Sequence, residues 1–223
     1  MTDLRALPDS HELDEMSARF ERAPAGAVVR WAWERFGTGL ALASSFQDCV
    51  LIDVAVSTAP EVEVIFLDTG FHFPETLEYV ETVRRRYDLN LRVIHPEPEA
   101  RDWPCGTERC CELRKVAPLA RALEDRAAWM TGLRRVETAN RSDAPIVGWD
   151  EARGLVKVNP LASWSDLDVA GYAADHDLPV HPLTSRGYLS IGCAPTTRAV
   201  LPGEDARAGR WFGTDKTECG LHI

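Results

Sequence analysis

The sequence lacks an excess of positive charge, long hydrophobic runs and internal repeats. Its 223 residues include 25 lysines and arginines against 35 aspartates and glutamates, for a formal net charge of -10 at pH 7. This balance excludes a nucleic-acid or anionic-membrane partner bound through bulk electrostatics, because a phosphate backbone would on average be repelled. No apolar run is long enough to cross a bilayer. An anionic ligand must therefore be held by local groups of cations.

An export signal is also missing, since the first 23 residues show no basic start, apolar core or small-residue cleavage site. We therefore expect a cytoplasmic protein. In that compartment, the 6 cysteines indicate reduced thiols, metal ligation or catalysis rather than a disulfide framework. Cys49 lies inside an apolar helical run and is predicted to be in the core.

Four apolar, β-rich runs alternate with helical stretches, the pattern of an α/β protein with a parallel sheet. The predicted strands span residues 40–43, 62–67, 91–95 and 128–131, and the predicted helices 12–35, 49–57, 74–86 and 111–124. We also expect a hairpin within 146–158 and a helix over 166–175, where Ser165 and Asp168 are spaced as a capping pair. After residue 179 the chain turns irregular, which in a compact protein indicates a functional or disordered segment.

Two segments follow predicted strands, where open α/β sheets bind their ligands. Residues 44–48 offer two hydroxyls and a run of backbone amides leading into a helix, which suits either an anion cradle or an ordinary helix cap. Residues 68–73 contain a glycine that permits close backbone approach to a ligand. The aromatic residues of that segment either wall a nucleoside pocket or pack in the core. Both interpretations stay open at this point.

Cations gather at a few places along this acidic chain, as gripping a polyanion would require. They are Arg114 and Lys115, Arg134 and Arg135, and then Arg198, Arg207 and Arg210. Taken singly, each would most often be a solvated surface group. Their positions beside strand ends and glycines favour binding.

Cys110 and Cys111 are adjacent and so too close for an ordinary disulfide. At the start of a helix, both side chains could instead point at one bulky metal cluster, with Cys193 as a third thiolate. Iron–sulfur clusters usually take four ligands, and the natural fourth position is occupied by Thr196. The alternatives are a zinc site that recruits Cys105, or buried structural cysteines without a metal.

Cys219 lies close to the end of the chain, in a tail too short to bury a thiol. Glu218 and His222 flank it and can adjust its protonation. We interpret Cys219 as a reactive group on a flexible arm that moves between two partners. A frayed end with an incidental cysteine is the alternative.

Taken in order, these motifs resemble the assimilatory sulfonucleotide reductases. The resemblance is to the bacterial adenylyl-sulfate (APS) reductases that carry a cysteine pair, within a wider family that includes phosphoadenylyl-sulfate (PAPS) reductases. It runs from about residue 40 to residue 222. The motifs are Ser44-Ser45-Phe46, Leu67-Asp68-Thr69-Gly70, Cys110-Cys111-x-x-Arg114-Lys115, Thr131-Gly132-Leu133-Arg134-Arg135, Ile191-Gly192-Cys193-Ala194-Pro195 and Lys216-Thr217-Glu218-Cys219-Gly220-Leu221-His222.

The resemblance implies a parallel-sheet fold like that of the PP-loop (adenine nucleotide alpha hydrolase-like) enzymes, with a flexible C-terminal catalytic tail. It implies that Cys219 attacks the sulfur of APS and that an external thioredoxin or glutaredoxin then releases sulfite. The substrate-binding residues it implies are Ser44, Ser45, Phe46, Leu67, Asp68, Thr69, Gly70, Lys115, Arg134, Arg207 and Arg210. It also implies a [4Fe-4S] cluster held by Cys110, Cys111 and Cys193.

Thr196 is the departure from the family pattern, because cysteine-pair members carry the fourth cluster ligand there. Four outcomes are open: a cluster held by three cysteines, a fourth site filled by Thr196 or water, substitution by Cys105, or no cluster. The expected organisation is a helical segment over 1–38, a sulfonucleotide-binding domain over 39–200, and an arginine-bearing segment with the catalytic tail over 201–223. The sequence leaves the oligomeric state open, including a homo-oligomer.

Three rival functions follow from the same residues. The first is a PAPS reductase. The second is a PP-loop ATP pyrophosphatase or adenylyltransferase, which would use a Ser-Gly-Gly loop where this chain has Ser45-Phe46-Gln47. The third is a non-catalytic redox or metal-binding module in which Cys219 only oxidises reversibly.

Overall fold

The computed structural model describes residues 7–214, 216, 218 and 220–221 of the chain. The helices in that part are α1 (Ser10–Phe20), α2 (Ala25–Phe36), α3 (Val50–Thr58), α4 (Pro74–Tyr87), α5 (Glu108–Cys111), α6 (Ala117–Leu123) and α7 (Asp166–Asp175). The strands are β1 (Leu40–Ser44), β2 (Glu63–Leu67), β3 (Leu91–Ile94), β4 (Ala128–Thr131), β5 (Val147–Asp150) and β6 (Leu155–Val158). None of the helices described is long and apolar enough to cross a membrane.

The strands form one mainly parallel six-stranded sheet in the order β3-β2-β1-β4-β6-β5. Leu40 of β1 lies opposite Ala128 of β4, and Ala128 lies opposite Val156 of β6, in parallel register. Only β5 is antiparallel, closing the predicted hairpin against β6. The order of strands reverses beside β1, and open α/β sheets bind ligands at the carboxyl ends of strands at such a reversal. The predicted α/β fold and all of its predicted strands are confirmed.

The predicted helix over 12–35 is wrong, because this stretch forms two helices. α1 ends at Phe20, and α2 begins at Ala25 with Pro24 as its N-cap residue. Proline lacks the amide that a continuous helix would need, and its ring clashes with the carbonyl four residues earlier. The chain therefore breaks at Pro24. The predicted capping pair at α7 is confirmed, since the Ser165 hydroxyl accepts a hydrogen bond from the Asp168 amide at 3.2 Å.

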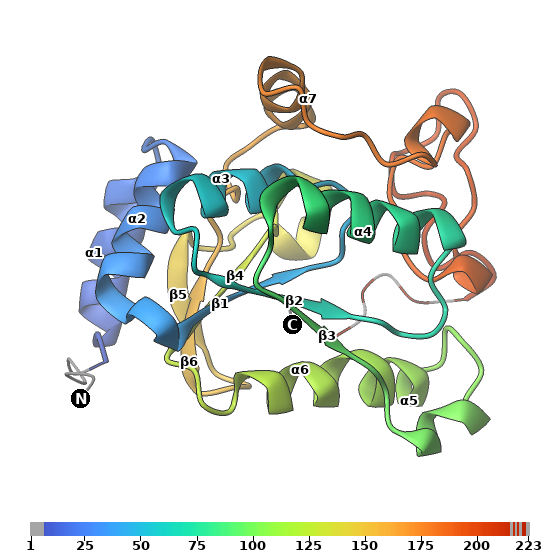
Figure 1. Cartoon of the computed structure of the whole chain (residues 1–223), viewed down its shortest axis with the longest axis horizontal. Helices are drawn as coiled ribbons and strands as arrows, with labels where there is room; N and C mark the ends of the chain where they lie inside the picture. The colour runs from blue at the N-terminus through green and yellow to red at the C-terminus, as the bar shows by residue number, and fades with distance from the viewer. Residues whose placement is uncertain (1–6, 215, 217, 219, 222–223) are drawn as a thin grey trace. The chain divides into compact units, whose positions relative to one another are not determined.

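The chain is organised as two compact units, the first comprising residues 1–43, 50–64 and 125–178. Within it, α1 and α2 lie side by side (Figure 1), joined by Phe20 and Trp31, whose ring centroids are 5.7 Å apart. Its core contains the buried indole of Trp129, which donates a hydrogen bond to Asp150 at 3.0 Å. Satisfying the indole N–H in this way allows so large a side chain to be fully buried.

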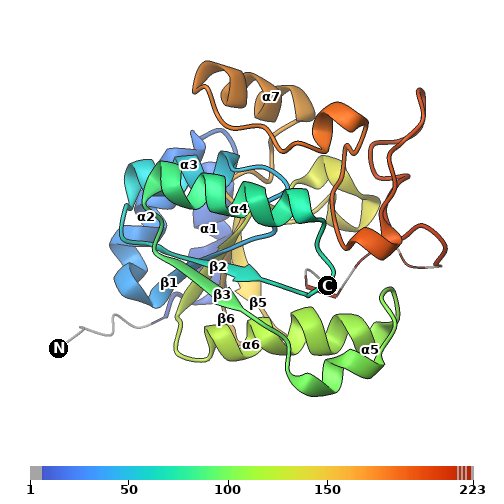
Figure 2. The same cartoon turned by 45° about the vertical axis from the view of Figure 1, so that its right-hand side comes forward.

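The second unit comprises residues 44–49, 65–124 and 179–223. Within it, α4 and the α5–α6 segment lie on opposite sides of β3 (Figure 2). A π-helical turn, Glu112–Val116, joins α5 to α6, so the predicted helix over 111–124 begins three residues earlier, at Glu108, and carries a π turn. The described residues after 179 form only short 3-10 turns, tied together by a bridge between Thr197 and Arg210.

Candidate functional site

The loop that follows β1 has a strained backbone and a buried anchor. The Ser44 hydroxyl accepts a hydrogen bond from the Phe46 amide at 3.1 Å, and Ser45 is exposed. Phe46 has a φ of 54°, which is uncommon for a residue with a side chain. Its ring is fully buried against Phe66, with the centroids 5.3 Å apart. Phe46 therefore shapes the loop from the core, while Ser45 is presented at its surface.

Gln47 ties this loop to a segment far along the chain. Its side-chain oxygen accepts hydrogen bonds from the Ile191 amide at 2.9 Å and from the Ser190 hydroxyl at 3.3 Å. Arg210 donates to the same two residues, to the Ile191 carbonyl at 3.0 Å and the Ser190 hydroxyl at 3.1 Å. A Cβ on Gly192 would lie 2.7 Å from the Arg210 guanidinium carbon, so only glycine lets Arg210 lie against the backbone here. The sequence placed Gln47 in the candidate cradle over 44–48 but assigned no role to its side chain.

The loop that follows β2 is closed by its own side chains. The Asp68 carboxylate and the Thr69 hydroxyl each accept a hydrogen bond from the amide two residues further on, at 2.9 and 3.2 Å. Gly70, with a φ of 70°, occupies the left-handed region that favours glycine. The Leu67 carbonyl lies 3.0 Å from the His72 Nε2 atom. Side-chain-closed turns of this kind hold a loop in one conformation without secondary structure.

Arg114 stabilises the loop after β2. Its guanidinium donates to the Thr69 carbonyl at 2.5 Å and to the Ala100 carbonyl at 2.8 Å, and lies 4.3 Å from the centre of the Phe71 ring. The side chain is only 8% exposed, although it carries a full charge. Arg114, three residues after the cysteine pair, therefore supports the loop after β2. Phe71 is half-buried beside it.

Four sulfur and hydroxyl side chains meet next to this loop. The Cys193 sulfur lies 3.6 Å from the Thr69 hydroxyl and forms a hydrogen bond with the Cys105 thiol. The Cys105 sulfur in turn lies 3.8 Å from the Thr196 hydroxyl. Cys193 and Thr196 are buried, and Cys105 is half-buried. The structure thus brings together Cys193 and Thr196, which the sequence singled out, with Cys105, which it held as an alternative.

The electrostatic surroundings of Cys193 favour its thiolate. The hydrogen bond from Cys105 lowers the pKa of Cys193, and the positive charge of Lys115 and the hydroxyl of Thr69 lower it further against the effect of burial. The same hydrogen bond raises the pKa of Cys105, because the proton then stays on that sulfur. A thiolate is the form of cysteine that binds metals or reacts.

Cys110 and Cys111 are both buried and end α5, which is the first turn of the helical stretch that continues into α6. The Thr107 side chain caps this helix by accepting a hydrogen bond from the Cys110 amide at 3.2 Å, and the Thr107 carbonyl accepts one from the Cys111 amide at 3.2 Å. The predicted position of the pair at a helix start is confirmed. Among the described residues, no three cysteine, histidine or acidic side chains are grouped as ligands of a metal ion.

Three cations surround the indole ring of Trp211. The Lys115, Lys216 and Arg210 side chains lie 5.3, 5.5 and 5.8 Å from the ring centroid. Trp211 is 5% exposed and has a φ of 57°, a strained backbone conformation that persists only where the surrounding structure fixes it. The face of an indole attracts cations and so positions them without neutralising them. Sequence reasoning missed Trp211, although it stands next to Arg210.

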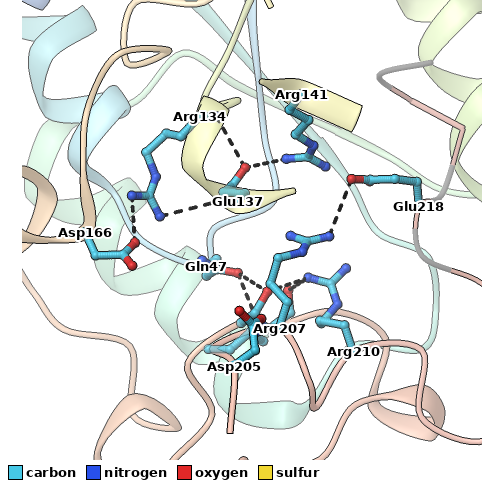
Figure 3. A network of polar contacts seen from close by, with 11 residues as sticks. Gln47, Arg134, Glu137, Arg141, Asp166, Asp205, Arg207, Arg210 and Glu218 are labelled. Carbon is cyan, nitrogen blue, oxygen red and sulfur yellow. Dashed lines mark hydrogen bonds and ion pairs between the residues drawn. The ribbon is translucent and has the colours of Figure 1, made fainter. Parts of the chain in front are cut away.

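Arg207 contacts the tail of the chain. Its guanidinium lies 3.8 Å from the Glu218 carboxylate, and the two side chains are 16% and 8% exposed (Figure 3). The Arg207 amide also donates to the Asp205 carboxylate at 2.8 Å. Cys219, the predicted nucleophile, lies outside the described residues, but the residue before it is therefore held by Arg207.

Arg134 belongs to the first unit, where it pairs with acidic residues. Its guanidinium lies 2.8 Å from the Asp166 carboxylate and 4.0 Å from that of Glu137 (Figure 3). The first contact is an ion pair without hydrogen-bond alignment, since the nitrogen concerned has no hydrogen-bond partner. Glu137 also pairs with Arg141.

Comparison with known proteins identifies the family of the chain. The family model described as "Phosphoadenosine phosphosulfate reductase domain" matches residues 39–199, and the chain belongs to this family. Among its relatives, the adenosine 5'-phosphosulfate reductases of Streptomyces coelicolor and Mycolicibacterium smegmatis are 45% and 44% identical to it. The alignments cover 98% and 100% of this chain and 100% of each relative. The resemblance inferred from the motifs is confirmed.

Solved structures agree with this assignment. The phosphoadenylyl-sulfate (PAPS) reductase of Candida auris has a TM-score of 0.75 and 27% identity, covering 86% of this chain and 98% of that one. The FMN adenylyltransferase of Candida glabrata has a TM-score of 0.61 at 14% identity, covering 87% of this chain and 69% of that one. The second likeness concerns the fold alone.

Proposed function

We propose that the chain is an adenylyl-sulfate reductase that converts APS to sulfite and AMP at the expense of thioredoxin or a similar dithiol protein. The observation that carries this proposal is the 44–45% identity to adenosine 5'-phosphosulfate reductases over the full length of those relatives. The alignment with the Mycolicibacterium smegmatis relative covers 100% of this chain and so includes the tail. The reaction would serve sulfate assimilation in the cytoplasm.

The chemistry takes two steps. The Cys219 thiolate attacks the sulfur atom of APS, a sulfur–sulfur bond forms, and the bond between sulfur and the phosphate oxygen breaks to release AMP. A thiolate of the reductant then attacks the Cys219 sulfur and expels sulfite. The second thiol of the reductant resolves the mixed disulfide, so the dithiol supplies both electrons and restores the Cys219 thiol.

The second unit supplies most of the groups for this chemistry. Ser44 ends β1 and Ser45 begins the loop after it. The buried Phe46 sets the conformation of that loop, and Gln47 links it to the segment that Arg210 contacts. Arg207 and Arg210 would bind the phosphate and sulfate oxygens. Fixed cations at that point stabilise the charge that develops on the departing AMP, without any acid having to protonate a phosphate.

Lys115 and Arg134 complete the proposed binding set. Lys115 is near both Cys193 and Trp211. Its charge lowers the pKa of Cys193, and its ammonium lies 5.3 Å from the Trp211 ring centroid. This supports a place between the substrate and the cysteine group. Arg134 already has acidic partners, and we propose that an anionic substrate exchanges with them. The end of β2 and the closed loop after it would contact the nucleotide through Leu67, Asp68, Thr69 and Gly70.

The family's iron–sulfur cofactor fits the residues present. Cys110, Cys111 and Cys193 are buried thiols rather than disulfides, and Lys115 provides a nearby positive charge that suits a cluster with anionic ligands. A cluster of several irons holds its cysteines farther apart than one ion does. We propose that these three residues hold a [4Fe-4S] cluster, which when bound supplies a local electrostatic field. This chain's own residues carry the sulfur chemistry.

The test is an intact-mass measurement on anaerobic protein mixed with APS alone. We expect a sulfite adduct on one thiol, mapped to Cys219 by digestion and lost when reduced thioredoxin is added. Cys219→Ser should form no adduct while binding AMP as the parent does, and Cys49→Ser, which changes a buried thiol elsewhere, should react like the parent. Unmodified parent protein would refute the reductase and favour a redox or metal-binding module.

PAPS is the second candidate substrate, favoured by the structural likeness to the Candida auris PAPS reductase. The two substrates differ by a 3'-phosphate on the ribose. We expect kcat/KM to be higher for APS than for PAPS, in agreement with the cysteine pair. A higher kcat/KM for PAPS would overturn the APS assignment and leave the thiosulfonate chemistry intact.

A further inference from the structure

Cys105 and Thr196 lie against each other although 91 positions separate them in the chain. The Cys105 sulfur is 3.8 Å from the Thr196 hydroxyl. Thr196 stands three residues after Cys193, where the family pattern calls for the fourth cysteine. Cys105, which is not part of the family pattern, therefore lies beside Thr196, where the pattern has a cysteine.

The loop that carries Cys105 is built to approach Thr196 closely. Gly106 has a φ of 96°, and a Cβ there would lie 3.0 Å from the Thr196 methyl carbon and 2.9 Å from that of Thr214. Only glycine fits such a conformation and such a contact. On its other side the loop is fixed by the Thr107 hydroxyl, which donates to the Pro104 carbonyl at 3.0 Å and caps the helix of the cysteine pair.

The chemistry of the two side chains favours sulfur as the ligand. Iron–sulfur clusters are held by soft sulfur ligands, whereas a threonine hydroxyl is a hard oxygen ligand. The Thr196 hydroxyl is also turned toward the backbone, at 3.5 Å from the Cys193 carbonyl. Cys105 is half-buried, and its side chain already reaches Thr196.

We propose that Cys105 is the fourth cysteine ligand of the cluster, in place of the ligand that is missing at Thr196. The inference rests on the proposed function, in which Cys110, Cys111 and Cys193 hold the other three positions. It predicts that the fourth ligand comes from the loop before the cysteine pair rather than from the segment after Cys193. A cysteine at position 105 and a cysteine at position 196 would each place a thiolate at the same corner of the cluster, but from different segments of the chain.

The experiment compares the parent with four variants, all purified without oxygen: Cys105→Ser, Thr196→Cys, Cys105→Ser combined with Thr196→Cys, and Cys49→Ser. The readouts are iron and zinc per chain, the visible absorbance of the cluster, and the rate at which a chelator removes iron. Cys49→Ser is the matched control, because it changes a buried cysteine whose sulfur lies 3.9 Å from the Pro179 carbonyl. Circular dichroism and AMP binding check that each variant is folded.

We expect about four irons per chain in the parent, as a four-iron cluster requires. Cys105→Ser should lose iron to the chelator at least about tenfold faster, since removing even a hydrogen-bond partner of a metal ligand costs about 10–100-fold in affinity. The double variant should recover the slow rate, because Thr196→Cys restores a thiolate at the family position. Cys49→Ser should match the parent.

Two results overturn the proposal and are distinguishable from each other. A parent with about four irons whose chelation rate is unchanged by Cys105→Ser refutes Cys105 as a ligand and leaves the cluster standing. A parent without iron, with zinc, or with a Cys105–Cys193 disulfide refutes the cluster itself and with it the role of Cys105. The sulfite adduct on Cys219 is measured separately, so failure of the reductase proposal would appear there.

Discussion

Arg207 holds Glu218, the residue immediately before the proposed nucleophile, across 3.8 Å. Both side chains are mostly buried, so water screens this ion pair less than it would an exposed pair. If Arg207 also binds substrate oxygens, then Glu218 and an anionic nucleotide compete for one guanidinium. The distance is longer than that of a charge-assisted hydrogen bond, which suits a contact that must be exchanged.

Glu218→Gln is therefore expected to tighten AMP binding, because the amide keeps the shape of the side chain but no longer competes as an anion. A pair worth about 1 kcal/mol corresponds to roughly fivefold in Kd. Isothermal titration calorimetry at low and high salt would measure the change, which should shrink as salt rises. Glu81→Gln, on the exposed face of α4, removes a carboxylate of equal charge and should leave Kd unchanged. Weaker binding in Glu218→Gln would contradict the competition.

Gly192→Ala should impair ligand binding. The added Cβ would meet the Arg210 guanidinium at 2.7 Å, so the guanidinium, the mobile end of its side chain, should move aside and give up its hydrogen bonds to Ser190 and Ile191. If Arg210 makes one charge-assisted hydrogen bond to the ligand, its displacement costs about 1.5–3 kcal/mol, or roughly ten- to hundredfold in affinity for AMP.

The matched control for this substitution is Gly171→Ala. Gly171 lies on the exposed side of α7 with nothing within 4 Å of its added Cβ, and alanine favours a helix. Thermal unfolding and calorimetry on both variants separate the two effects. A Gly192→Ala protein that binds AMP like Gly171→Ala would remove Arg210 from the proposed binding set.

The regular elements of this protein were predictable because strands and helices leave regular local patterns in the sequence. Each strand is an apolar run of the right length, and the Ser165–Asp168 spacing predicted the start of α7. The exception was the N-terminal stretch, where one helix over 12–35 was predicted although Pro24 lies within it. Proline lacks the backbone donor that a continuous helix needs.

The loops that form the candidate site were predictable in position but not in contact. The segments after β1 and β2 were identified from their place in an α/β sheet, and Cys193 from its glycine and proline neighbours. The approach of Cys105 to Thr196, or of Gln47 to Ile191, has no periodic signal, because irregular chain brings residues together through individual hydrogen bonds. Trp211 escaped notice for the same reason.

Arg114→Lys is expected to destabilise the fold by about 2–4 kcal/mol. Lysine cannot reproduce the fork that donates to both the Thr69 and the Ala100 carbonyls, and each buried carbonyl left without its donor carries a penalty of about 1–3 kcal/mol. For a chain of this size, 1 kcal/mol corresponds to roughly 2–4 °C in Tm. Arg85→Lys, at a position 72% exposed on α4, is the control and should keep the parent Tm. An equal Tm in the two variants would remove Arg114 as the support of the β2 loop.

His181 is expected to make stability fall as the solution becomes acidic. The ring is 2% exposed; its Nδ1 accepts a hydrogen bond from the Leu183 amide at 3.2 Å, so Nε2 carries the proton and donates to the Thr76 hydroxyl at 3.0 Å. Burial lowers the pKa of His181 from 6.5 to about 4, against the opposing effect of Glu75. Because the folded state binds this proton less readily than the unfolded state, its contribution is complete above pH 6.5 and is lost as the pH falls toward 4.

The loss amounts to about 3 kcal/mol across that interval, since one pKa unit is worth about 1.4 kcal/mol. Urea unfolding at a series of pH values would measure it in the parent and in His181→Asn, whose side-chain oxygen can still accept from the Leu183 amide but cannot titrate. His11→Asn, at a position 82% exposed, is the control and should retain the parent's slope. Between pH 6.5 and 4, the stability of His181→Asn should depend less on pH than the stability of the parent or of His11→Asn. Parallel curves for all three proteins would place the acid sensitivity in other groups.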